Sequence, residues 1–503
     1  MLRIWRSERG LPMIDQSILV LDEGTTSTRA MLFAQDGALR GAKQAELTQH
    51  YPRSGWVEHD AGEIWEKTLA CARAMVDKAG GAGRIAAIGI TNQRETVVAW
   101  DKETGEPLSR AIVWQDRRTA DICRQLKDAG HEAEVRARTG LLLDPYFSGT
   151  KMRWLLNNDA VIKAAASAGT LAFGTVESWL VWKLTGGAQH ISDASNASRT
   201  LLLPLDASGW DQELCGLLGV PVETLPRVTD CAGELAVTEP GLLGGAIPIC
   251  GMAGDQQAAT IGQGCLSPGE TKATYGTGAF VLSNTGTEVP WSDNRLLGTV
   301  LYQLAGERHY AIEGAVFVAG SLIKYLRDTL GLIATAAETE ELARSIPDNG
   351  GVVVVPALSG LGAPHWRPEA RGIISGLGFD TGRAHIARAS LEAMAHQTRD
   401  LASGFAADGC QWTGLRIDGG MAVNDWMAQD IADILGQSVT RPDFVETTAL
   451  GAAMLAAVGC GMKADLREAA DSMIGATQVF RPGMNEEARQ HRLSRWEAAL
   501  KKV

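Results

Sequence analysis

The chain has 503 residues, of which 45% are hydrophobic and 21% are charged, and its formal net charge is −12. This length exceeds what one hydrophobic core usually supports, so we expect two or more domains. The composition is typical of a globular protein. The acidic balance disfavours a sequence-independent nucleic-acid binder and a protein that binds anionic membranes.

Eight cysteines are scattered along the chain without a CxxC pair. This pattern favours reduced thiols in a cytoplasmic protein over a disulfide framework or a zinc site. No apolar run approaches the roughly 18 residues that a membrane span needs. Arginines in the first dozen residues are not followed by an apolar segment, which disfavours a secretory signal. We expect residues 1–13 to be a disordered extension or one that is not translated.

Residues 18–33, ILVLDEGTTSTRAMLF, begin with an unbroken apolar run that is typical of a strand buried on both faces. Asp22 follows at once, and then come a glycine, three hydroxyl residues and Arg29. Backbone N–H groups and hydroxyls in such a turn can bind phosphate oxygens while the carboxylate faces a cation. An ordinary polar hairpin turn is the alternative, because short polar turns are common.

Two later segments repeat this order of strand, glycine turn and polar residues. Residues 246–250 predict a strand that leads through a glycine turn to Asp255 and Gln256 at the start of a helix, where an acid also serves as an ordinary cap. Residues 272–283, KATYGTGAFVLS, predict a strand, a turn and a second strand. A change of domain is expected near residues 262–272, where the pattern restarts.

The rest of the chain predicts alternating strands and helices. Arg94 beside Glu95 is a pair most often found on solvated surfaces, and this remains the simpler interpretation, although the place of the pair at the exit of a buried strand strengthens the case for a functional role. Tyr146 and Phe147 lie in an unusual loop, where core packing is the simpler interpretation. We expect an irregular connection over residues 205–245, helices over residues 62–76, 119–127, 313–326, 384–401 and 487–502, and a small-residue helix from residue 448 that packs tightly on its neighbours.

Several common nucleotide and metal motifs are missing from the sequence. GxxxxGK[ST], a strand followed by GxGxxG, and HExxH do not occur, which disfavours P-loop, dinucleotide and zinc-protease chemistry. The remaining pattern predicts a phosphate-binding cleft with hard oxygen ligands, for which a magnesium–nucleotide complex is the natural ligand.

An ordered set of motifs spans residues 18–482: DEGTTSTR, ITNQRET, WQDRR, DPYFSGTK, GMAGDQQAA, YGTGAF, GLGAPHW, IDGGMAVN and TTALGAA. This order resembles that of glycerol kinases in the FGGY carbohydrate kinase family, and QRET with DPYFSGTK distinguishes them from pentulose and gluconate kinases. The resemblance implies an α/β fold with two actin/hexokinase/Hsp70-like (ribonuclease-H-like) ATPase domains around a central cleft. The N-terminal domain would cover residues 14–264, with the glycerol and phosphate-loop side, and the C-terminal domain residues 265–503, with the nucleotide side.

The resemblance also implies the reaction and its site. ATP, with Mg²⁺, would phosphorylate glycerol to sn-glycerol 3-phosphate, the first step of glycerol catabolism, and Asp255 would accept the proton of the attacking hydroxyl. The implied glycerol ligands are Arg94, Glu95, Tyr146, Asp255 and Gln256, with Trp114 and Phe280 as apolar walls. The implied nucleotide contacts are Thr25, Thr26, Ser27, Arg29, Thr277, Gly320, Lys324, Gly420 and Asn424, and Asp22 would lie on the metal side.

Three residues depart from the family pattern. Glu23 stands where many relatives carry Gln, and we expect its negative charge beside the phosphate loop to tighten the dependence on Mg²⁺. Glu177 replaces a more usual Asp and receives no role, and Lys324 replaces a frequent Gln near the nucleoside.

The sequence contains few signals of regulation or of oligomeric assembly. Residues 241–248 lack the arginine by which some relatives bind a sugar-phosphate inhibitor, and residues 205–245 contain no histidine for activation by phosphorylation. A homodimer or homotetramer is implied by resemblance only. The alternatives are a related carbohydrate (pentulose) kinase and a non-catalytic actin- or Hsp70-like ATPase, which would not need Arg94, Glu95 and Tyr146 together.

Overall fold

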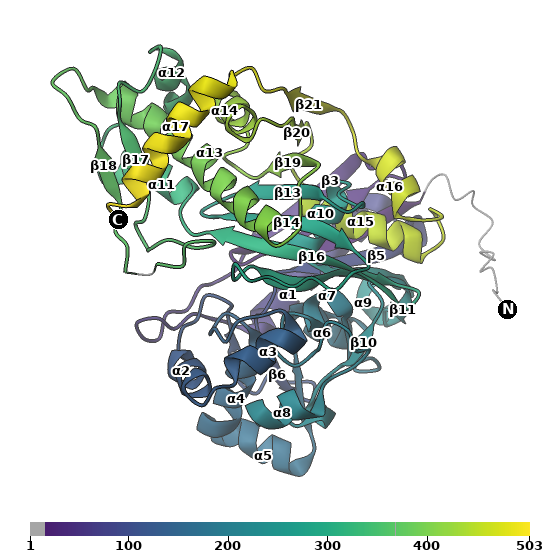
Figure 1. Cartoon of the computed structure of the whole chain (residues 1–503). Coiled ribbons are helices and arrows are strands. Elements are labelled where there is room, and N and C mark those ends of the chain that lie inside the picture. The colour runs from purple at the N-terminus through teal and green to yellow at the C-terminus, as the bar shows by residue number, and fades with distance from the viewer. Residues whose placement is uncertain (1–15, 368) are drawn as a thin grey trace.

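The computed structural model describes residues 16–367 and 369–503. Helices α2–α6 and α8 gather at one end of the molecule and helices α11–α14 and α17 at the other, with the two large sheets between them (Figure 1). The predicted extension over residues 1–13 lies outside the described residues.

Over residues 16–367 and 369–503, the strands form two large sheets and four pairs. Their bounds are β1 (Ser17–Glu23), β2 (Ser27–Phe33), β3 (Leu39–Glu46), β4 (Glu58–His59), β5 (Ile85–Asn92), β6 (Val98–Asp101), β7 (Ala111–Ile112), β8 (Leu171–Gly174), β9 (Ile191–Asp193), β10 (Arg227–Thr229), β11 (Ala232–Val237), β12 (Pro248–Gly254), β13 (Glu270–Tyr275), β14 (Ala279–Gly286), β15 (Leu297–Leu304), β16 (Glu307–Val316), β17 (Val353–Val355), β18 (Ile373–Ser375), β19 (Gly414–Asp418), β20 (Val439–Pro442) and β21 (Thr477–Phe480).

The helices cover the sheets and build the two ends of the molecule. Their bounds are α1 (Ala61–Ala79), η2 (Ala82–Arg84), α2 (Ala120–Asp128), α3 (Glu132–Thr139), α4 (Ser148–Asn158), α5 (Ala160–Ala168), α6 (Val176–Leu184), α7 (Ala194–Ala197), α8 (Gln212–Leu218), η3 (Val222–Thr224), α9 (Pro240–Leu243), α10 (Asp255–Gly262), α11 (Gly320–Asp328), α12 (Glu338–Arg344), α13 (Arg383–Ala407), α14 (Asp425–Leu435), α15 (Thr447–Gly459), α16 (Leu466–Met473) and α17 (Glu486–Leu500).

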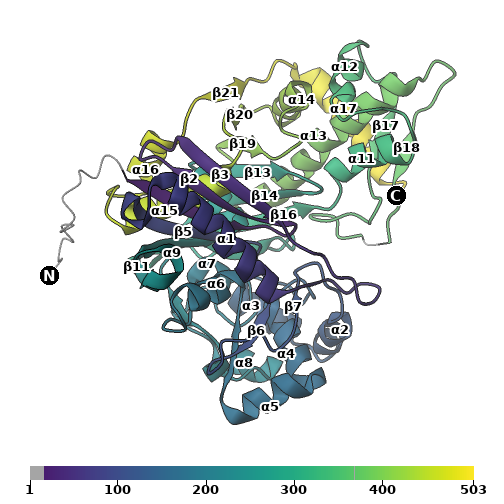
Figure 2. The ribbon, with the colours of Figure 1, turned by 180° about the vertical axis from the view of Figure 1, so that it is seen from behind.

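The first sheet has the strand order β11-β12-β5-β1-β2-β3. Strand β1 is buried along its whole length, as its unbroken apolar run predicts, and it pairs antiparallel with β2 and parallel with β5. Helix α1 packs across β2 and β3 (Figure 2). The predicted opening hairpin therefore lies in the interior of this sheet, with β5 on one side and β3 on the other.

The second sheet repeats this arrangement, in the order β15-β16-β14-β13-β19-β20-β21. Strand β13 pairs antiparallel with β14 and parallel with β19, as β1 does with β2 and β5. In both sheets a hairpin thus lies in the interior, and a parallel strand lies beside its first member. The repeat that the sequence suggests between residues 18–33 and 272–283 is a repeat of topology.

Helices α10 and α15 approach each other so closely that only glycine fits at the contact. A Cβ atom on Gly262 would lie 2.0 Å from the carbonyl oxygen of Thr447, and one on Gly451 would lie 1.8 Å from that of Ala258. The prediction that the small-residue helix from residue 448 packs tightly on its neighbours is confirmed.

Helix α15 also covers the first sheet, although it comes from the last quarter of the chain. A Cβ on Gly89 of β5 would lie 2.4 Å from the carbonyl oxygen of Ala452, and one on Gly251 of β12 would lie 2.5 Å from the amide nitrogen of Ala456. One buried cluster therefore joins Ile18 and Val20 to residues of α15 and α16. The division at residues 264 and 265 separates the two sheets along the chain and remains a prediction.

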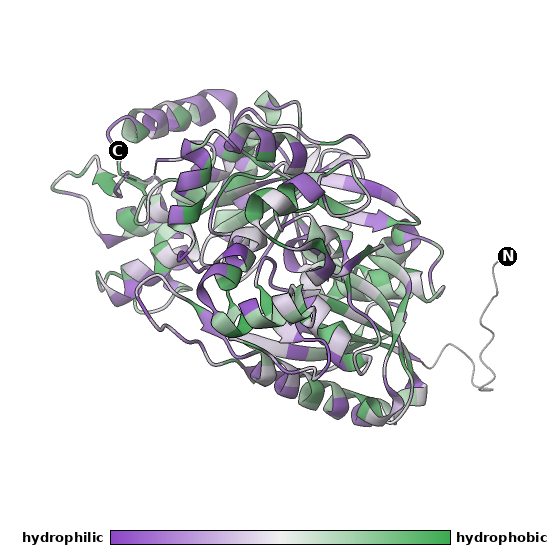
Figure 3. Ribbon diagram, turned by 90° about the horizontal axis from the view of Figure 1, so that it is seen from below, coloured by the Kyte–Doolittle hydropathy of each residue, from purple (hydrophilic) through white to green (hydrophobic). Residues whose placement is uncertain are grey.

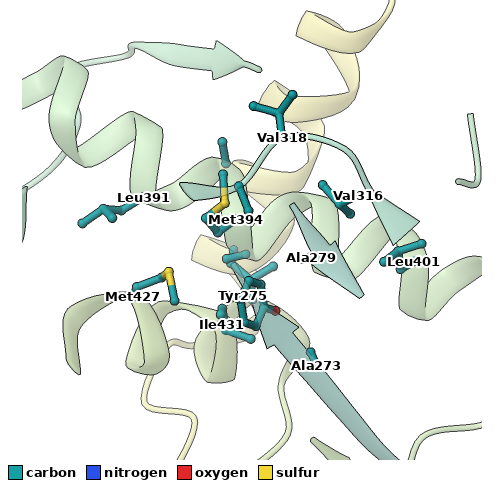
Figure 4. Close-up of a cluster of buried hydrophobic side chains, with 14 of the residues drawn as sticks. Ala273, Tyr275, Ala279, Val316, Val318, Leu391, Met394, Leu401, Met427 and Ile431 are labelled. Carbon is teal, nitrogen blue, oxygen red and sulfur yellow. The ribbon is translucent and has the colours of Figure 1, made fainter. Parts of the chain in front are cut away.

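Side chains of helices α13 and α14 pack around the end of β13. Tyr275, the last residue of β13, lies among Met394, Met427 and Ile431 (Figure 4). Its hydroxyl forms a 2.6 Å hydrogen bond with the Thr398 hydroxyl. The C-terminal helix α17 is mostly hydrophilic, with Trp496 buried (Figure 3). The packing of Tyr275 and its hydrogen bond to Thr398 fix the end of β13, from which the next turn begins.

Two predictions about secondary structure were wrong. Residues 205–245 contain the helix α8 and the strands β10 and β11, and β11 is the edge strand of the first sheet. Residues 313–316 belong to β16, because β14 and β15 pair with them, and helix α11 begins only at Gly320. Across the described residues, no helix is both long and apolar enough to cross a membrane.

Candidate active site

The hairpin of β1 and β2 places Asp22 directly opposite Arg29 in the strand register. The Arg29 guanidinium donates to the Asp22 carboxylate and, at 2.6 Å, to Glu446, which precedes α15. Burial raises the pKa of Asp22, although Arg29 opposes this shift. The two sequence-predicted residues therefore form an ion pair, and Glu446 is a partner that sequence reasoning missed.

The turn between β1 and β2 is short and closed. The Gly24 amide donates to the Ser27 carbonyl at 3.0 Å. Thr26 is exposed at the tip, and the Thr25 hydroxyl accepts a 2.9 Å hydrogen bond from the Trp114 indole. The turn thus presents hydroxyls and amides at an accessible edge, next to an indole predicted for the glycerol site.

Glu23 does not face this turn, so the expected charge beside the phosphate loop is absent. Its side chain points to the opposite face of the hairpin, where it is buried and accepts hydrogen bonds from Thr28 and from Thr68 of α1. Burial raises the pKa of Glu23 to about 8. Strand alternation explains the difference, because Asp22 and Glu23 must point to opposite faces. A pKa near 8 favours the protonated form at neutral pH, and the side chain faces away from the turn, so the predicted effect on the Mg²⁺ dependence loses its physical basis.

Arg94 is the centre of a buried network that follows the end of β5. Its Nη1 lies 2.6 Å from Glu313 and 3.3 Å from the Gln257 side-chain oxygen, and its Nη2 lies 3.2 Å from Glu313 and 3.3 Å from the Tyr146 hydroxyl. Its Nε lies 3.3 Å from Asp255 Oδ1. Arg94 thus joins its own segment to the Tyr146 loop, to helix α10 and to strand β16.

Glu95 adopts a backbone conformation that is rare outside glycine, with φ 63°. The Thr96 amide donates to the Arg94 carbonyl at 2.8 Å, so the three residues form a γ-turn. Such backbone strain persists only where the surroundings hold it, and it is common at functional sites. The Glu95 carboxylate accepts a 2.7 Å hydrogen bond from Arg199 Nε.

Glu313 and Arg199 close the network and were missed by sequence reasoning. Glu313 comes from β16 of the second sheet and binds Arg94 and Arg199, both of which follow elements of the first half. These two arginines lower the pKa of Glu313 to about 2 against the opposing effect of burial. The predicted helix over residues 313–326 hid Glu313, whereas a strand pattern would have shown it as a buried charge.

Asp255 and Gln256 open helix α10, as predicted. The Gln256 amide donates to Asp255 Oδ1 at 2.7 Å, and the Asp255 side chain is 35% exposed. Burial raises the pKa of Asp255 to about 6, while Arg94 opposes the shift. The Gln256 side-chain oxygen accepts a hydrogen bond from the buried ammonium of Lys272. Asp255 therefore combines access to the surface with a raised pKa.

The aromatic residues predicted for the site are only partly brought together. Trp114 and Tyr146 meet edge to face, with ring centroids 5.6 Å apart. Phe147 is buried, as the core-packing interpretation predicts, whereas Tyr146 is half-buried and bound to Arg94. Phe280 is half-buried on β14, opposite Thr274 in the register. Thr274 and Gln256 both accept from Lys272, which links this hairpin to α10.

The turn between β13 and β14 is built from backbone contacts. The Gly276 amide donates to the Gly278 carbonyl at 2.9 Å, and the Gly320 amide at the start of α11 donates to the Gly276 carbonyl at 2.9 Å. Thr277 is exposed at the tip. The structure therefore brings Thr277 and Gly320 together, as a shared nucleotide site would require.

The remaining predicted nucleotide contacts lie near this turn or beside it. The amide of Met421, next to Gly420, donates to the Tyr275 carbonyl at 3.1 Å. Asn424 caps α14 by accepting from the Met427 amide, which is the ordinary structural role of such a residue. Lys324 is exposed on α11. Their roles as nucleotide contacts remain predictions.

The residues that could face a cation lie close to the first hairpin. Asp418, the last residue of β19, accepts from Gln263 at 3.0 Å and from the Thr447 hydroxyl through Oδ2. Its buried Oδ1 has no partner among the described residues. Thr447 adjoins Glu446, which binds Arg29 and through it Asp22. Hard carboxylate oxygens are thus available beside the predicted phosphate loop.

Comparison with known proteins agrees with this arrangement. Residues 17–262 match the N-terminal domain of the FGGY family of carbohydrate kinases, and residues 271–460 match its C-terminal domain. The chain is 53% identical to the glycerol kinase of Alcanivorax borkumensis, over 97% of this chain and 98% of that protein. It is 51% identical to glycerol kinase 1 of Pseudomonas aeruginosa, over 97% and 98% of the two chains.

Solved structures show the same fold. The crystal structure of Plasmodium falciparum glycerol kinase with ADP has a TM-score of 0.92 and 33% identity, and covers 97% of this chain and 98% of that one. The gluconate kinase of Lactobacillus acidophilus shares the fold, with a TM-score of 0.86, 22% identity and coverage of 97% of each chain. The predicted family and fold are confirmed. The chain belongs to the FGGY family of carbohydrate kinases.

Proposed function

We propose that this chain is a glycerol kinase, which transfers the γ-phosphoryl group of ATP to glycerol and forms sn-glycerol 3-phosphate. The observation that carries the proposal is the convergence of Arg94, Glu95, Tyr146 and Asp255 in one cluster of hydrogen-bond donors and acceptors. Identity of about half of all residues to curated glycerol kinases over nearly the whole chain supports the same activity.

The cluster suits a small polyol because it mixes donors and acceptors. Each hydroxyl of glycerol can donate and accept one or more hydrogen bonds, so a site with a guanidinium, carboxylates and a phenol satisfies it. The edge of Trp114 against Tyr146 supplies apolar surface for the carbon chain. A site built to bind hydroxyls rejects molecules that lack them.

Asp255 is the proposed general base. Its pKa of about 6 leaves the carboxylate ionised at neutral pH yet basic enough to accept the proton of the attacking hydroxyl. Arg94 lies 3.3 Å from Asp255 Oδ1, which orients the carboxylate. The Gln256 amide holds that same oxygen at 2.7 Å, so Oδ2 is the proposed atom for the proton.

The proposed phosphate site lies between the two hairpin turns. Thr25, Thr26, Ser27 and Thr277 offer hydroxyls and amides, and Arg29 supplies a positive charge for the transferred group. Mg²⁺ fits the available oxygens, because Asp22 and the unpartnered Oδ1 of Asp418 are hard ligands. When bound, Mg²⁺ would neutralise charge on the nucleotide phosphates.

Cellular setting and assembly follow the same proposal. All eight cysteines are free thiols, which supports a reducing compartment such as the cytoplasm. A homodimer or homotetramer is proposed from the resemblance to the family.

A substrate panel tests the activity directly. ATP consumption is measured with glycerol, dihydroxyacetone, xylulose, ribulose and gluconate. The proposal predicts the highest kcat/KM for glycerol. Activity confined to a pentulose would replace it with the related pentulose kinase, and ATP hydrolysis that no polyol stimulates would favour an actin- or Hsp70-like ATPase.

The variant Asp255→Asn tests the role of the base. Its kcat should fall by about 10²–10⁴-fold, because that is the usual contribution of a general base. Binding of glycerol should persist, since the amide keeps the size and polarity of the side chain. A decrease of less than about tenfold would show that another group accepts the proton.

A further inference from the structure

The ammonium group of Lys151 is buried beside the proposed glycerol site. Lys151 belongs to the first turns of α4 and is 0% exposed. Its Nζ donates to the Glu95 carbonyl at 3.2 Å and to the Tyr146 carbonyl. One side chain therefore holds the backbones of two proposed glycerol ligands, which come from separate loops.

Burial of the Lys151 ammonium lowers the stability of the folded protein. A buried cation loses its hydration, and no carboxylate of the described residues lies within 4.0 Å of Lys151 Nζ to compensate. Burial accordingly lowers the pKa of Lys151 to about 8. An apolar side chain of similar length would fill the same space without this cost. A role other than packing is therefore needed to explain the charge.

The held segments are those that most need support. Glu95 occupies the strained γ-turn with φ 63°, a conformation that the surroundings must maintain. The Glu95 carbonyl receives two donors from α4, the Ser148 hydroxyl at 3.1 Å and Lys151 Nζ. The Tyr146 carbonyl is held by the same ammonium, which fixes the distance between the two loops.

We infer that Lys151 is a positioning residue for the polyol site: it locks the Glu95 turn and the Tyr146 loop in the mutual placement that binds substrate hydroxyls. This inference rests on the proposed function. Lys151 itself does not touch the substrate, since both of its contacts are backbone carbonyls. Its loss should therefore weaken polyol binding far more than nucleotide binding or the chemical step.

The test is a comparison of steady-state constants for Lys151→Met, which keeps the length of the side chain and removes the donors. The KM for glycerol should rise by about 10- to 100-fold, since two charge-assisted hydrogen bonds are lost. The KM for ATP should stay within about twofold, and kcat should fall by less than about fivefold. Glycerol binding to the nucleotide-free protein, followed by calorimetry, should weaken by the same factor as KM rises.

Two further variants keep the inference falsifiable. Ser148→Ala removes the neutral donor to the same Glu95 carbonyl and should raise the KM for glycerol in the same direction by about three- to tenfold. Lys183→Met is the matched control. Lys183 lies on another helix, α6, and likewise donates to a backbone carbonyl, that of Gly105, at 3.3 Å. The kcat and the KM values of this variant should not change. If Lys151→Met does not fold, Ser148→Ala decides.

The outcomes separate this inference from the proposed function. Wild-type turnover of the substrate panel tests the function, and the ratio of variant to wild type tests Lys151. If the wild type prefers another polyol, the same ratio is measured for that polyol. An unchanged polyol KM, or equal losses in polyol and ATP affinity with a lower melting temperature, would overturn the positioning role and leave a structural one.

Discussion

The hairpins β1–β2 and β13–β14 occupy the same place in their sheets, but only the first carries an acidic residue at the matching position. In the first sheet Asp22 lies on the hairpin and is paired in register with Thr91 of the parallel neighbour β5. In the second sheet Thr274 lies on the hairpin, and Asp418 is its partner on β19. The two copies thus keep the backbone arrangement and exchange the position of the acid. The strand pairing around the hairpin therefore does not determine which strand carries the acidic residue.

The two turns differ in the same way. The first presents side chains, with Arg29 and three hydroxyl residues around one glycine. The second is made of close backbone contacts: a Cβ on Gly320 would lie 2.6 Å from the Gly276 carbonyl oxygen, and one on Gly278 would lie 2.6 Å from the Val316 carbonyl oxygen. We therefore expect charge removal to damage the first hairpin and added volume to damage the second.

Among the variants of the two hairpins, the largest effect should come from Arg29→Met. Arginines that stabilise a transferring phosphoryl group typically contribute about 10³ or more to the rate, so kcat should fall by about that factor. The KM for glycerol should change little, because Arg29 pairs with Asp22 and Glu446 and not with the Arg94 network. Stopped-flow or coupled assays of ADP release provide the measurement.

Arg40→Met is the control for this variant, since Arg40 lies on the exposed strand β3 and donates to Ser17. Arg29→Lys keeps a positive charge next to Asp22. It therefore distinguishes a direct loss of catalysis from unfolding caused by a buried, unpaired Asp22. A kcat for Arg29→Met within about tenfold of the wild type would remove Arg29 from the reaction.

Among these hairpin variants, Gly320→Ala should produce the next largest effect, through the added volume of its Cβ atom alone. The new Cβ would meet the Gly276 carbonyl at 2.6 Å and push the exposed turn that carries Thr277. The KM for ATP should rise by about 10- to 50-fold, while glycerol binding stays unchanged. Gly216→Ala on α8 is the matched control, because its Cβ would meet no atom within 4 Å. Equal damage by the two alanines would contradict the expected contrast between the hairpins.

The sequence predicted the individual strands, turns and helix starts better than the contacts between segments that are distant in the chain. The hairpin that carries Asp22 and Arg29, and the place of Asp255 at a helix start, follow from strand length and turn residues, which are local signals, whereas the ion pair between Asp22 and Arg29 was not predicted. Glu313 was missed because its neighbours are small and apolar, so that residues 311–320 fit a helix and a strand equally well before β14 and β15 are known to flank them. Helix α15 on the first sheet is a contact between distant segments, which no local pattern contains.

Asp255 belongs to neither hairpin, and pH should therefore test it separately. Its pKa of about 6 means that the carboxylate becomes protonated below that pH and can no longer accept a proton. The kcat/KM for glycerol should fall about tenfold per pH unit below this value, and should be level between pH 7 and 8. In Asp255→Asn the residual rate should lose this acid limb. An acid limb that survives in the variant would assign the titration to another group.

Glu23 should give the smallest effect, and it shows what the two hairpins share. Glu23 and Tyr275 are the last residues of β1 and β13, and each is buried on the helix side of its hairpin. Glu23 accepts from Thr68 of α1, and Tyr275 bonds to Thr398 of α13. Both are therefore core residues that anchor a hairpin to a helix, whatever the chemistry on the other face.

If Glu23 is a neutral core residue, Glu23→Gln should leave the Mg²⁺ titration of activity unchanged at pH 7. Its signature should appear in stability instead. The folded-state pKa is about 8, whereas the ordinary pKa of a glutamate is 4.5. Between these two pH values unfolding releases a proton, so the wild type loses stability as pH rises from about 4.5 to about 8. Gln has no proton to release, so the denaturant midpoint of the variant should fall less over this range than that of the wild type. Parallel midpoints in both proteins, together with a shifted Mg²⁺ titration, would place an ionised Glu23 beside the phosphate loop after all.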